Sequence, residues 1–183
     1  MAAEDAGVRQ MWMTQGPIWP DTLTTLAAAA ETTSTINLGT SIVPTYPHHP
    51  LVMAQQALTL QGLAPGRFRL GIGPSHRLII EDMYGLRRGK PLTHLREYVE
   101  VLRATLRDRK VNHRGEFYTV EAMSQRTAQI PIFISTLGKK AFQLAGEIAD
   151  GALTWVCPIP YLIDIGIPAL RSSVSAAGRS APY

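Results

Sequence analysis

The sequence predicts an α/β protein in which helices cover a parallel β-sheet. Short runs typical of β-strands alternate with helical patterns along the whole chain, and this alternation indicates such a sheet. Neighbouring runs are also far enough apart to hold the helical crossovers that parallel strands need. With 183 residues, of which 45% are hydrophobic and 17% charged, the chain has the composition of an ordinary globular protein. We therefore expect a single domain over residues 1–183.

Three strands are expected in the first half of the chain, at residues 10–14, 36–43 and 67–73. Asp21 can cap a helix that follows the first strand. Pro50 stands in the first turn of the helix after the second strand, where its missing N–H costs nothing. Pro65 and Gly66 form the turn before the third strand.

Two further strands are expected at residues 130–135 and 151–156, with a helix at 139–148 between them. An earlier amphipathic helix carries apolar residues three and four positions apart, from Leu95 to Leu106. Its opposite face, which we interpret as solvent-exposed, carries Arg96, Glu97, Glu100, Arg103 and Arg107. Residues 111–120 indicate a β-hairpin around Arg114-Gly115, inserted between the regular βα units.

Composition argues against several classes of partner. The 18 lysines and arginines exceed the 14 acidic residues by only four and form no basic arm, so nucleic acid is not expected. The N-terminal MAAEDAG lacks the basic start of a signal peptide, which favours a cytoplasmic location. The apolar stretch 152–170 contains three prolines, so we expect no membrane span there. Cys157 is the only cysteine and the histidines lack ligand spacing, so we expect no metal site.

Glycines at the end of the third strand point to a ligand-binding edge. Gly71-Ile72-Gly73 could begin a dinucleotide fingerprint, but position 76 is His where the third glycine would stand. These glycines still let the backbone approach a ligand closely, and Ser75 and His76 follow as polar groups. The carboxyl ends of parallel strands are where (β/α)-barrel enzymes keep their chemistry.

Six segments follow one another as they do in the bacterial luciferase-like superfamily, which the chain resembles over nearly its whole length. They are LGTSIVP at 38–44, HP at 49–50 with AQQA at 54–57, GRFRLGIG at 66–73, HLREY at 94–98, GEF at 115–117 and LAGEIADG at 144–151. Within this superfamily, GPSH at 73–76 followed by EDMYGL at 81–86 is most similar to the actinobacterial deazaflavin-dependent oxidoreductases. Those proteins use coenzyme F-420, whereas luciferase uses reduced FMN.

The resemblance implies an incomplete TIM (β/α)₈-type barrel with the cofactor ring across the carboxyl ends of the strands. It also implies a cis peptide bond between Ser41 and Ile42, behind that ring. Gly73, Ser75 and His76 correspond to the loop that reaches the cofactor. His76 is the candidate catalytic residue, because histidine changes its charge between about pH 5 and pH 8. The alternative is that His76 only hydrogen-bonds the loop.

Three further residues are candidate cofactor contacts. Thr136 and Gly138 can bind a phosphate through backbone N–H groups at a helix start, or they can simply cap that helix. Trp155, at the end of the last strand, either contacts the ligand or packs in the core. Two more tryptophans lie near the first strand: Trp12 fits the barrel core, whereas Trp19 can wall the substrate side.

The sequence departs from the family pattern in two ways. Gln15-Gly16 stands where the best-known deazaflavin dehydrogenases have an Asp-His pair. A (β/α)₈ barrel also takes about 250 residues, and the first strand and the last two βα units have no counterpart here. We therefore expect open sheet edges at the strands of Trp12 and Trp155, which a homodimer can cover, and weak cofactor binding by this chain alone.

The resemblance implies an oxidoreductase that transfers a hydride between a reduced cofactor and a small organic substrate. The expected cofactor is coenzyme F-420 (8-hydroxy-5-deazaflavin), with FMN as the alternative. Two other functions stay open: an FMN-dependent monooxygenase that uses oxygen, and a non-catalytic, truncated module that binds a flavin or a partner protein.

Overall fold

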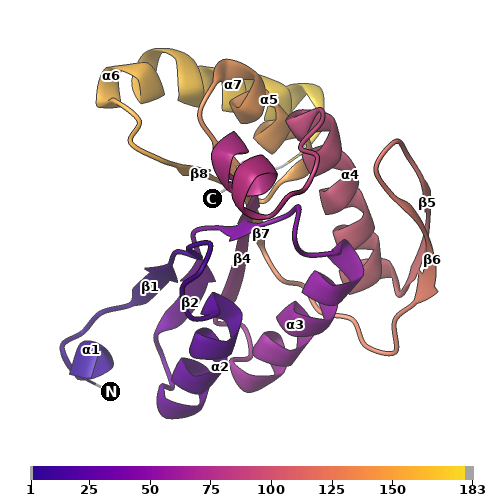
Figure 1. Cartoon of the computed structure of the whole chain (residues 1–183). Coiled ribbons are helices and arrows are strands. Elements are labelled where there is room, and N and C mark those ends of the chain that lie inside the picture. Colours follow the sequence, from indigo (N-terminus) through magenta and orange to yellow (C-terminus); the bar gives the residue numbers. More distant parts are fainter. Residues whose placement is uncertain (1, 180–183) are drawn as a thin grey trace.

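The computed structural model describes residues 2–179 and shows a curved sheet of parallel strands (Figure 1). Five strands lie in the order β1-β2-β4-β7-β8, and every neighbouring pair is parallel. They are β1 (Gln10–Met13), β2 (Asn37–Thr40), β4 (Phe68–Gly73), β7 (Ile132–Thr136) and β8 (Gly151–Thr154). The expected parallel α/β sheet is confirmed, and each strand begins within two residues of its expected start.

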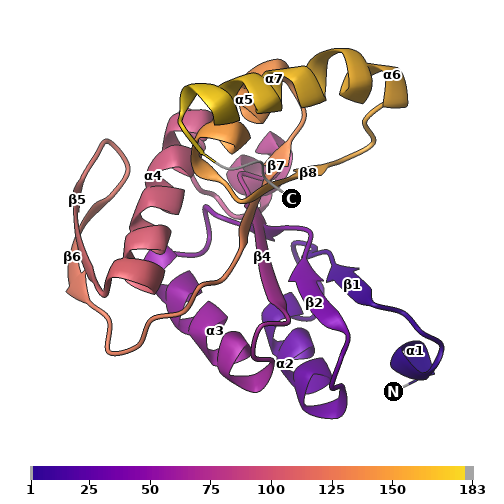
Figure 2. The same cartoon turned by 180° about the vertical axis from the view of Figure 1, so that it is seen from behind.

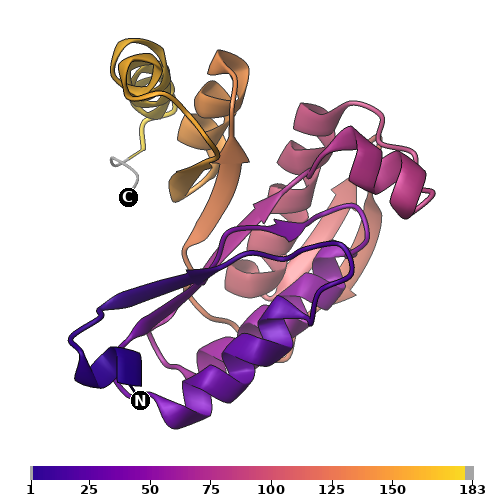
Figure 3. The same cartoon turned by 60° about the vertical axis from the view of Figure 1, so that its left-hand side comes forward.

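Helices connect the strands and pack mainly on one face of the sheet (Figures 2 and 3). The α-helices are α1 (Ala2–Asp5), α2 (Thr22–Thr32), α3 (Pro50–Leu63), α4 (Pro91–Arg103), α5 (Lys139–Ile148), α6 (Ile159–Tyr161) and α7 (Ile167–Ala176). The described residues also form π-helical turns: η1 (Leu78–Met83) after β4, η2 (Ala104–Asp108) after α4, and η3 (Leu162–Gly166) between α6 and α7. Asp21 caps α2 by accepting a hydrogen bond from Thr24 N–H at 2.7 Å, and Pro50 lies in the first turn of α3, as expected.

Side chains alternate between the two faces of the sheet. In β4, Phe68, Leu70 and Ile72 are buried in the core under the helices. The opposite, concave face carries Trp12 and Phe133, whose rings meet edge to face with 5.3 Å between their centroids. Trp12 therefore faces the barrel interior, as the sequence favours, where it is half-buried against Phe133.

The second expected strand, at residues 36–43, is divided in two. β2 ends at Thr40, and β3 (Val43–Pro44) is a separate two-residue strand that pairs with the end of β4. The Ser41–Ile42 peptide bond between them is cis, as the resemblance implies. One continuous strand was therefore the wrong prediction for this segment.

The hairpin of β5 (Lys110–Arg114) and β6 (Thr119–Met123) runs three residues beyond the expected range, with Lys110 paired to Met123. Glu97 of α4 holds its turn: the carboxylate accepts hydrogen bonds from the N–H groups of Glu116 at 2.9 Å, Phe117 at 2.9 Å and Tyr118 at 3.1 Å. Glu97 is only 7% exposed. The interpretation of this helix face as solvent-exposed is therefore wrong at Glu97.

The same interpretation is wrong at the other end of α4, where arginines converge on Asp150. This carboxylate lies at the amino end of β8, 2.7 Å from Arg107 Nη2 and 3.2 Å from Arg179 Nη2. Arg103 lies 3.5 Å away, and the N–H of Ile132 donates to Asp150 at 3.0 Å. Since these contacts join α4, β7, β8 and the end of α7, the amino edge of the sheet carries a structural charge network.

Candidate functional site

The predicted site residues lie at one edge of the sheet. Ser41 and Ile42 follow β2, the loop with Ser75 and His76 follows β4, and Trp155 follows β8. Because these strands are parallel, their carboxyl ends share one edge. The expectation that these residues share that edge is met, but a role in binding or catalysis stays a prediction for each of them.

Ile42 and Gly73, two predicted site residues 31 positions apart in the sequence, lie side by side in the structure. A Cβ atom at Gly73 would lie 2.2 Å from Ser135 Oγ and 3.3 Å from Ile42 Cδ1, so only glycine allows this packing. Ser41 is held from the side of β1, since its N–H donates to Met13 O at 2.8 Å. Ser135, near the end of β7, adds a polar side chain that the sequence did not single out.

The loop after β4 presents His76 to solvent. Ser75 has a φ of 58°, a left-handed backbone conformation that is costly for a residue other than glycine. Its carbonyl oxygen accepts a hydrogen bond from Arg88 Nη2 at 3.3 Å. His76 follows with an exposed side chain, at the carboxyl edge and free to meet a ligand.

A buried polar cluster supports this loop from behind. His94 of α4, 3% exposed, lies with Nε2 3.0 Å from Thr45 Oγ1. Thr45 in turn donates to Gly73 O, through its hydroxyl at 3.2 Å and its N–H at 2.9 Å. Burial lowers the pKa of His94 to about 4, against the smaller raising effect of Glu97, so the imidazole is neutral at pH 7. Sequence reasoning missed this cluster because Thr45 and His94 are 49 positions apart.

The remaining predicted contact residues, Thr136, Gly138 and Trp155, differ in their exposure to solvent. Thr136 is 1% exposed and its hydroxyl donates to Leu153 O at 3.3 Å, so only its backbone could reach a ligand. Gly138 is the N-cap of α5 and, like the two lysines after it, is exposed. Trp155 is 60% exposed, so the alternative that it packs in the core of this chain is wrong.

Large apolar side chains are exposed at the same edge. Ile18 and Trp19 lie in the segment after β1, Leu78 follows β4, and Val156 follows β8. Trp19, 62% exposed, packs on Gly16, where a Cβ atom would lie 2.3 Å from the indole ring. Gly16 supplies no side chain where the deazaflavin dehydrogenases have a histidine. Its lack of a Cβ atom instead makes room for the Trp19 ring at this edge. We call this exposed set the apolar rim; its members are Ile18, Trp19, Leu78, Leu137, Trp155 and Val156.

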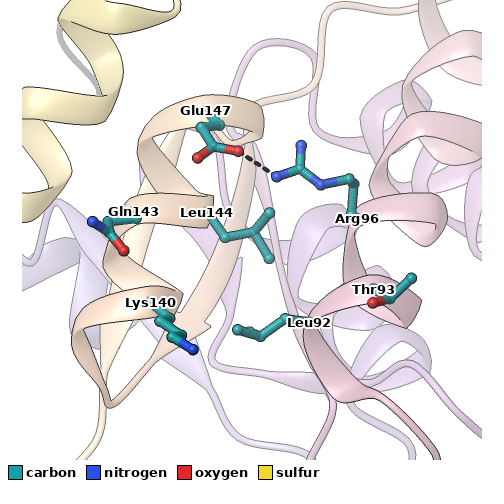
Figure 4. Close-up of a pocket in the computed structure, with 7 residues that line it drawn as sticks. All are labelled: Leu92, Thr93, Arg96, Lys140, Gln143, Leu144 and Glu147. Carbon is teal, nitrogen blue, oxygen red and sulfur yellow. Dashed lines mark hydrogen bonds and ion pairs between the residues drawn. The ribbon is translucent and has the colours of Figure 1, made fainter.

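Two surface cavities lie outside this site. One, of about 290 Å³, opens between α4 and α5, where Leu92 faces Leu144 beside the Arg96–Glu147 ion pair (Figure 4). The other, of about 410 Å³, lies between α1 and the start of β2. Across residues 2–179, no three metal-binding side chains cluster, and no helix is long and apolar enough to cross a membrane.

Comparison with known proteins identifies the fold. An F-420-dependent glucose-6-phosphate dehydrogenase of Nakamurella multipartita is 36% identical over 178 residues, which are 93% of this chain and 52% of that protein. The coenzyme F-420-dependent tetrahydromethanopterin reductase of Methanopyrus kandleri superposes with a TM-score of 0.86 at 29% identity, covering 97% of this chain and 56% of the other.

A third structure shows the fold alone: an FMN complex of the oxygenating constituent of 3,6-diketocamphane monooxygenase from Pseudomonas putida. It is 18% identical with a TM-score of 0.80, over 97% of this chain and 56% of the other. The chain spans about half the length of the curated relatives it matches. The family model of luciferase-like monooxygenases matches residues 1–182. The chain therefore belongs to the luciferase-like monooxygenase family, and its curved parallel sheet is an incomplete barrel of the kind found in that family.

Proposed function

We propose that the carboxyl edge binds a flavin-type cofactor, coenzyme F-420 in the first instance and FMN as the alternative. The observation that carries this proposal is the apolar rim, which lies at the same edge as the polar groups of Ser75 and His76, where barrel enzymes bind ligands. A flat tricyclic ring fits such a surface, because it is largely apolar and needs only a few polar partners. Similarity to F-420-dependent relatives supports F-420 as the first choice.

Each part of the edge has a distinct task in this proposal. Trp155 and Trp19 cover the ring and exclude water, while Ile42 and Gly73 support it from the sheet. Lys139, exposed after Gly138, attracts the anionic tail of the cofactor. His76 holds or releases a proton at an imidazole nitrogen beside the substrate.

The reaction proposed for the whole protein is hydride transfer between the reduced cofactor and a small organic substrate. When bound, the cofactor supplies the two electrons, and the protein supplies position and electrostatics. The cytoplasmic location expected from the sequence is part of the same proposal, since both cofactors are intracellular.

Fluorescence titration tests the proposal. We expect saturable, one-to-one binding of F-420, and binding of FMN instead would assign the alternative cofactor. Air oxidation of the bound reduced cofactor then separates the two chemistries, because an oxygen-using monooxygenase must react with oxygen. If neither cofactor binds, the proposal is wrong.

A matched pair of variants tests His76. His76→Asn should keep cofactor binding and slow hydride transfer, because an amide cannot take up or release a proton as an imidazole does. His49→Asn is the control: His49 is also exposed and caps α3 by accepting from Leu51 N–H, a role that Asn can fill. Equal hydride-transfer rates in both variants would show that His76 moves no proton and only stabilises the loop.

We also propose that a second copy of the chain covers the open edges of the sheet. β1 and β8 each pair with a single strand among residues 2–179, which leaves two strand edges unprotected. Sedimentation velocity should show a dimer, and Val156→Lys, beside the β8 edge, should shift it toward monomer. A monomer at all protein concentrations would contradict this proposal.

A further inference from the structure

The loop at residues 73–77, which carries His76, is tied to the protein body by two chains of hydrogen bonds. In the first, His94 Nε2 lies 3.0 Å from Thr45 Oγ1, and the Thr45 hydroxyl donates to Gly73 O at 3.2 Å. Since that hydroxyl has one proton, which goes to Gly73 O, His94 is the donor to Thr45. This chain runs from α4 to the first residue of the loop.

The second chain reaches the other side of the same loop. The hydroxyl of Tyr46 donates to the backbone oxygen of Arg88, and the Arg88 guanidinium donates to Ser75 O at 3.3 Å. The Tyr46 ring is stacked on His94, with 3.8 Å between centroids and 7° between planes. His94 thus begins the first chain and stacks on Tyr46, which begins the second. In the sequence it is 18 positions away from His76.

These contacts hold the loop in a backbone conformation that is unfavourable at Ser75. Ser75 has a φ of 58°, and a residue other than glycine keeps such a conformation only where its surroundings enforce it. The two side-chain contacts on this loop end at Gly73 O and Ser75 O, on either side of Pro74. Backbone N–H groups add to them, from Thr45 to Gly73 O at 2.9 Å and from Ile80 to His76 O at 3.1 Å. Removal of either side-chain contact should loosen the backbone just before His76 without detaching the loop.

We infer that Thr45 and His94 are positioning residues that fix the 73–77 loop and thereby set where His76 stands relative to the bound cofactor. The part of this inference that concerns the cofactor rests on the function proposed above. The part that concerns the loop does not, and it can be tested in the free protein.

Thr45→Val is the decisive variant, because it removes the hydroxyl and keeps the size and branching of the side chain. Thr45→Ser keeps the hydroxyl and should restore the wild-type behaviour. Thr105→Val is the matched control: Thr105 is also buried and its hydroxyl also donates to a backbone oxygen, that of Val101 at 2.8 Å, far along α4 from the loop. Each valine variant loses one buried hydroxyl, and Thr45→Ser keeps it. Comparison of the two valine variants therefore separates an effect on the loop from a general loss of stability.

Nitrogen-15 relaxation of the free protein gives the first readout. In the wild type and in Thr45→Ser, the amides of Ser75 and His76 should have order parameters near 0.85, the value of rigid backbone. In Thr45→Val they should fall toward about 0.6, whereas Thr105→Val should leave them unchanged. Flexible amides already in the wild type, or equal values in both valine variants, would overturn the inference.

Titration with F-420 gives the second readout. Thr45→Val should raise Kd about tenfold, the ratio that corresponds to one hydrogen bond, and Thr45→Ser should not. If the wild type binds no cofactor, the proposed function fails while the relaxation data still decide whether Thr45 holds the loop. If the wild type binds and Thr45→Val binds equally well, the positioning role toward the cofactor is wrong.

Discussion

Replacement of Glu97 by glutamine should destabilise the protein through the turn of the β5–β6 hairpin. The carboxylate of Glu97 accepts three backbone hydrogen bonds, one at Oε1 from Glu116 and two at Oε2 from Phe117 and Tyr118. A glutamine can keep its oxygen at one of these positions only, so its NH₂ group must face at least one N–H donor. Gly115 makes room for this carboxylate, since a Cβ atom there would lie 2.2 Å from Glu97 Oε2.

The expected loss is about 3 kcal/mol in the free energy of unfolding. An unsatisfied buried donor costs about 1–3 kcal/mol, and the remaining bonds lose the strength that a charged acceptor gives. For a protein of this size, each kcal/mol lowers Tm by about 2–4 °C, so a fall of roughly 6–12 °C is expected. Urea unfolding followed by circular dichroism at pH 7 measures the free energy, and a thermal scan measures Tm.

The effect should also depend on pH. Burial alone would raise the pKa of Glu97, but the hydrogen bonds from the hairpin turn outweigh it and lower the pKa below 4.5. A carboxyl group with a lowered pKa in the folded state stabilises the protein above its unfolded-state pKa, and this contribution is lost as the pH falls through the folded-state value. The gap between wild type and Glu97→Gln should therefore narrow below about pH 4.5.

The control is Glu147→Gln, the same substitution in an ion pair with Arg96 whose side chains are about 40% exposed. Exposed pairs contribute about 0–1 kcal/mol, so this variant should stay close to wild type. Equal losses in the two variants, or a gap for Glu97→Gln that does not change with pH, would refute the account of the hairpin turn.

Three further predictions concern other parts of the molecule. Gly71→Ala should lower the free energy of unfolding by about 3 kcal/mol, because its Cβ atom would lie 1.9 Å from the backbone oxygen of Thr40. Gly62→Ala, which has open space in α3, should raise it by about 0.5–1 kcal/mol. Urea midpoints that move in the same direction in both variants would contradict this. Asp150→Asn should cost about 2 kcal/mol, since it weakens a partly exposed network of three arginines, and an unchanged Tm would show that the network is dispensable. His94 should be neutral in the folded state down to about pH 4, below its unfolded-state pKa of 6.5, so acid removes stability in that window. The wild type should lose about 2 kcal/mol more than His94→Gln between pH 7 and pH 5, and parallel pH profiles would contradict this.

The sequence predicted the positions of the five parallel strands well because the evidence for them is local. Each strand and helix has its own periodicity, and parallel pairing follows from the crossovers between them. The division at Ser41 was missed, since nothing in the run of residues 36–43 marks where strand pairing stops. Glu97 was misread for a related reason: the hairpin that buries it folds back from residues about 20 positions further along the chain.

The candidate site was predictable in outline only. Strand ends marked by Gly73, and the polar residues after them, could be placed because all parallel strands end at one edge. The support of the loop by His94 and Tyr46 could not be predicted, because a hydrogen bond between residues far apart in the sequence has no signature in composition or spacing. Resemblance to a family added the cis bond at Ser41–Ile42, which propensity alone would have rejected.

The opposite placement of the Asp150 network and the apolar rim bears on how such a chain can diverge during evolution. Ion pairs at the amino edge join strands and helices, while the exposed rim residues lie on segments that follow the strands. Substitutions at the rim should therefore cost less stability than substitutions in the network. After gene duplication, one copy can change around Trp19 and Trp155, and with them the ligand that we propose for this edge, while the interactions that keep it folded stay intact. A scaffold organised in this way gives selection many new specificities at little risk to folding.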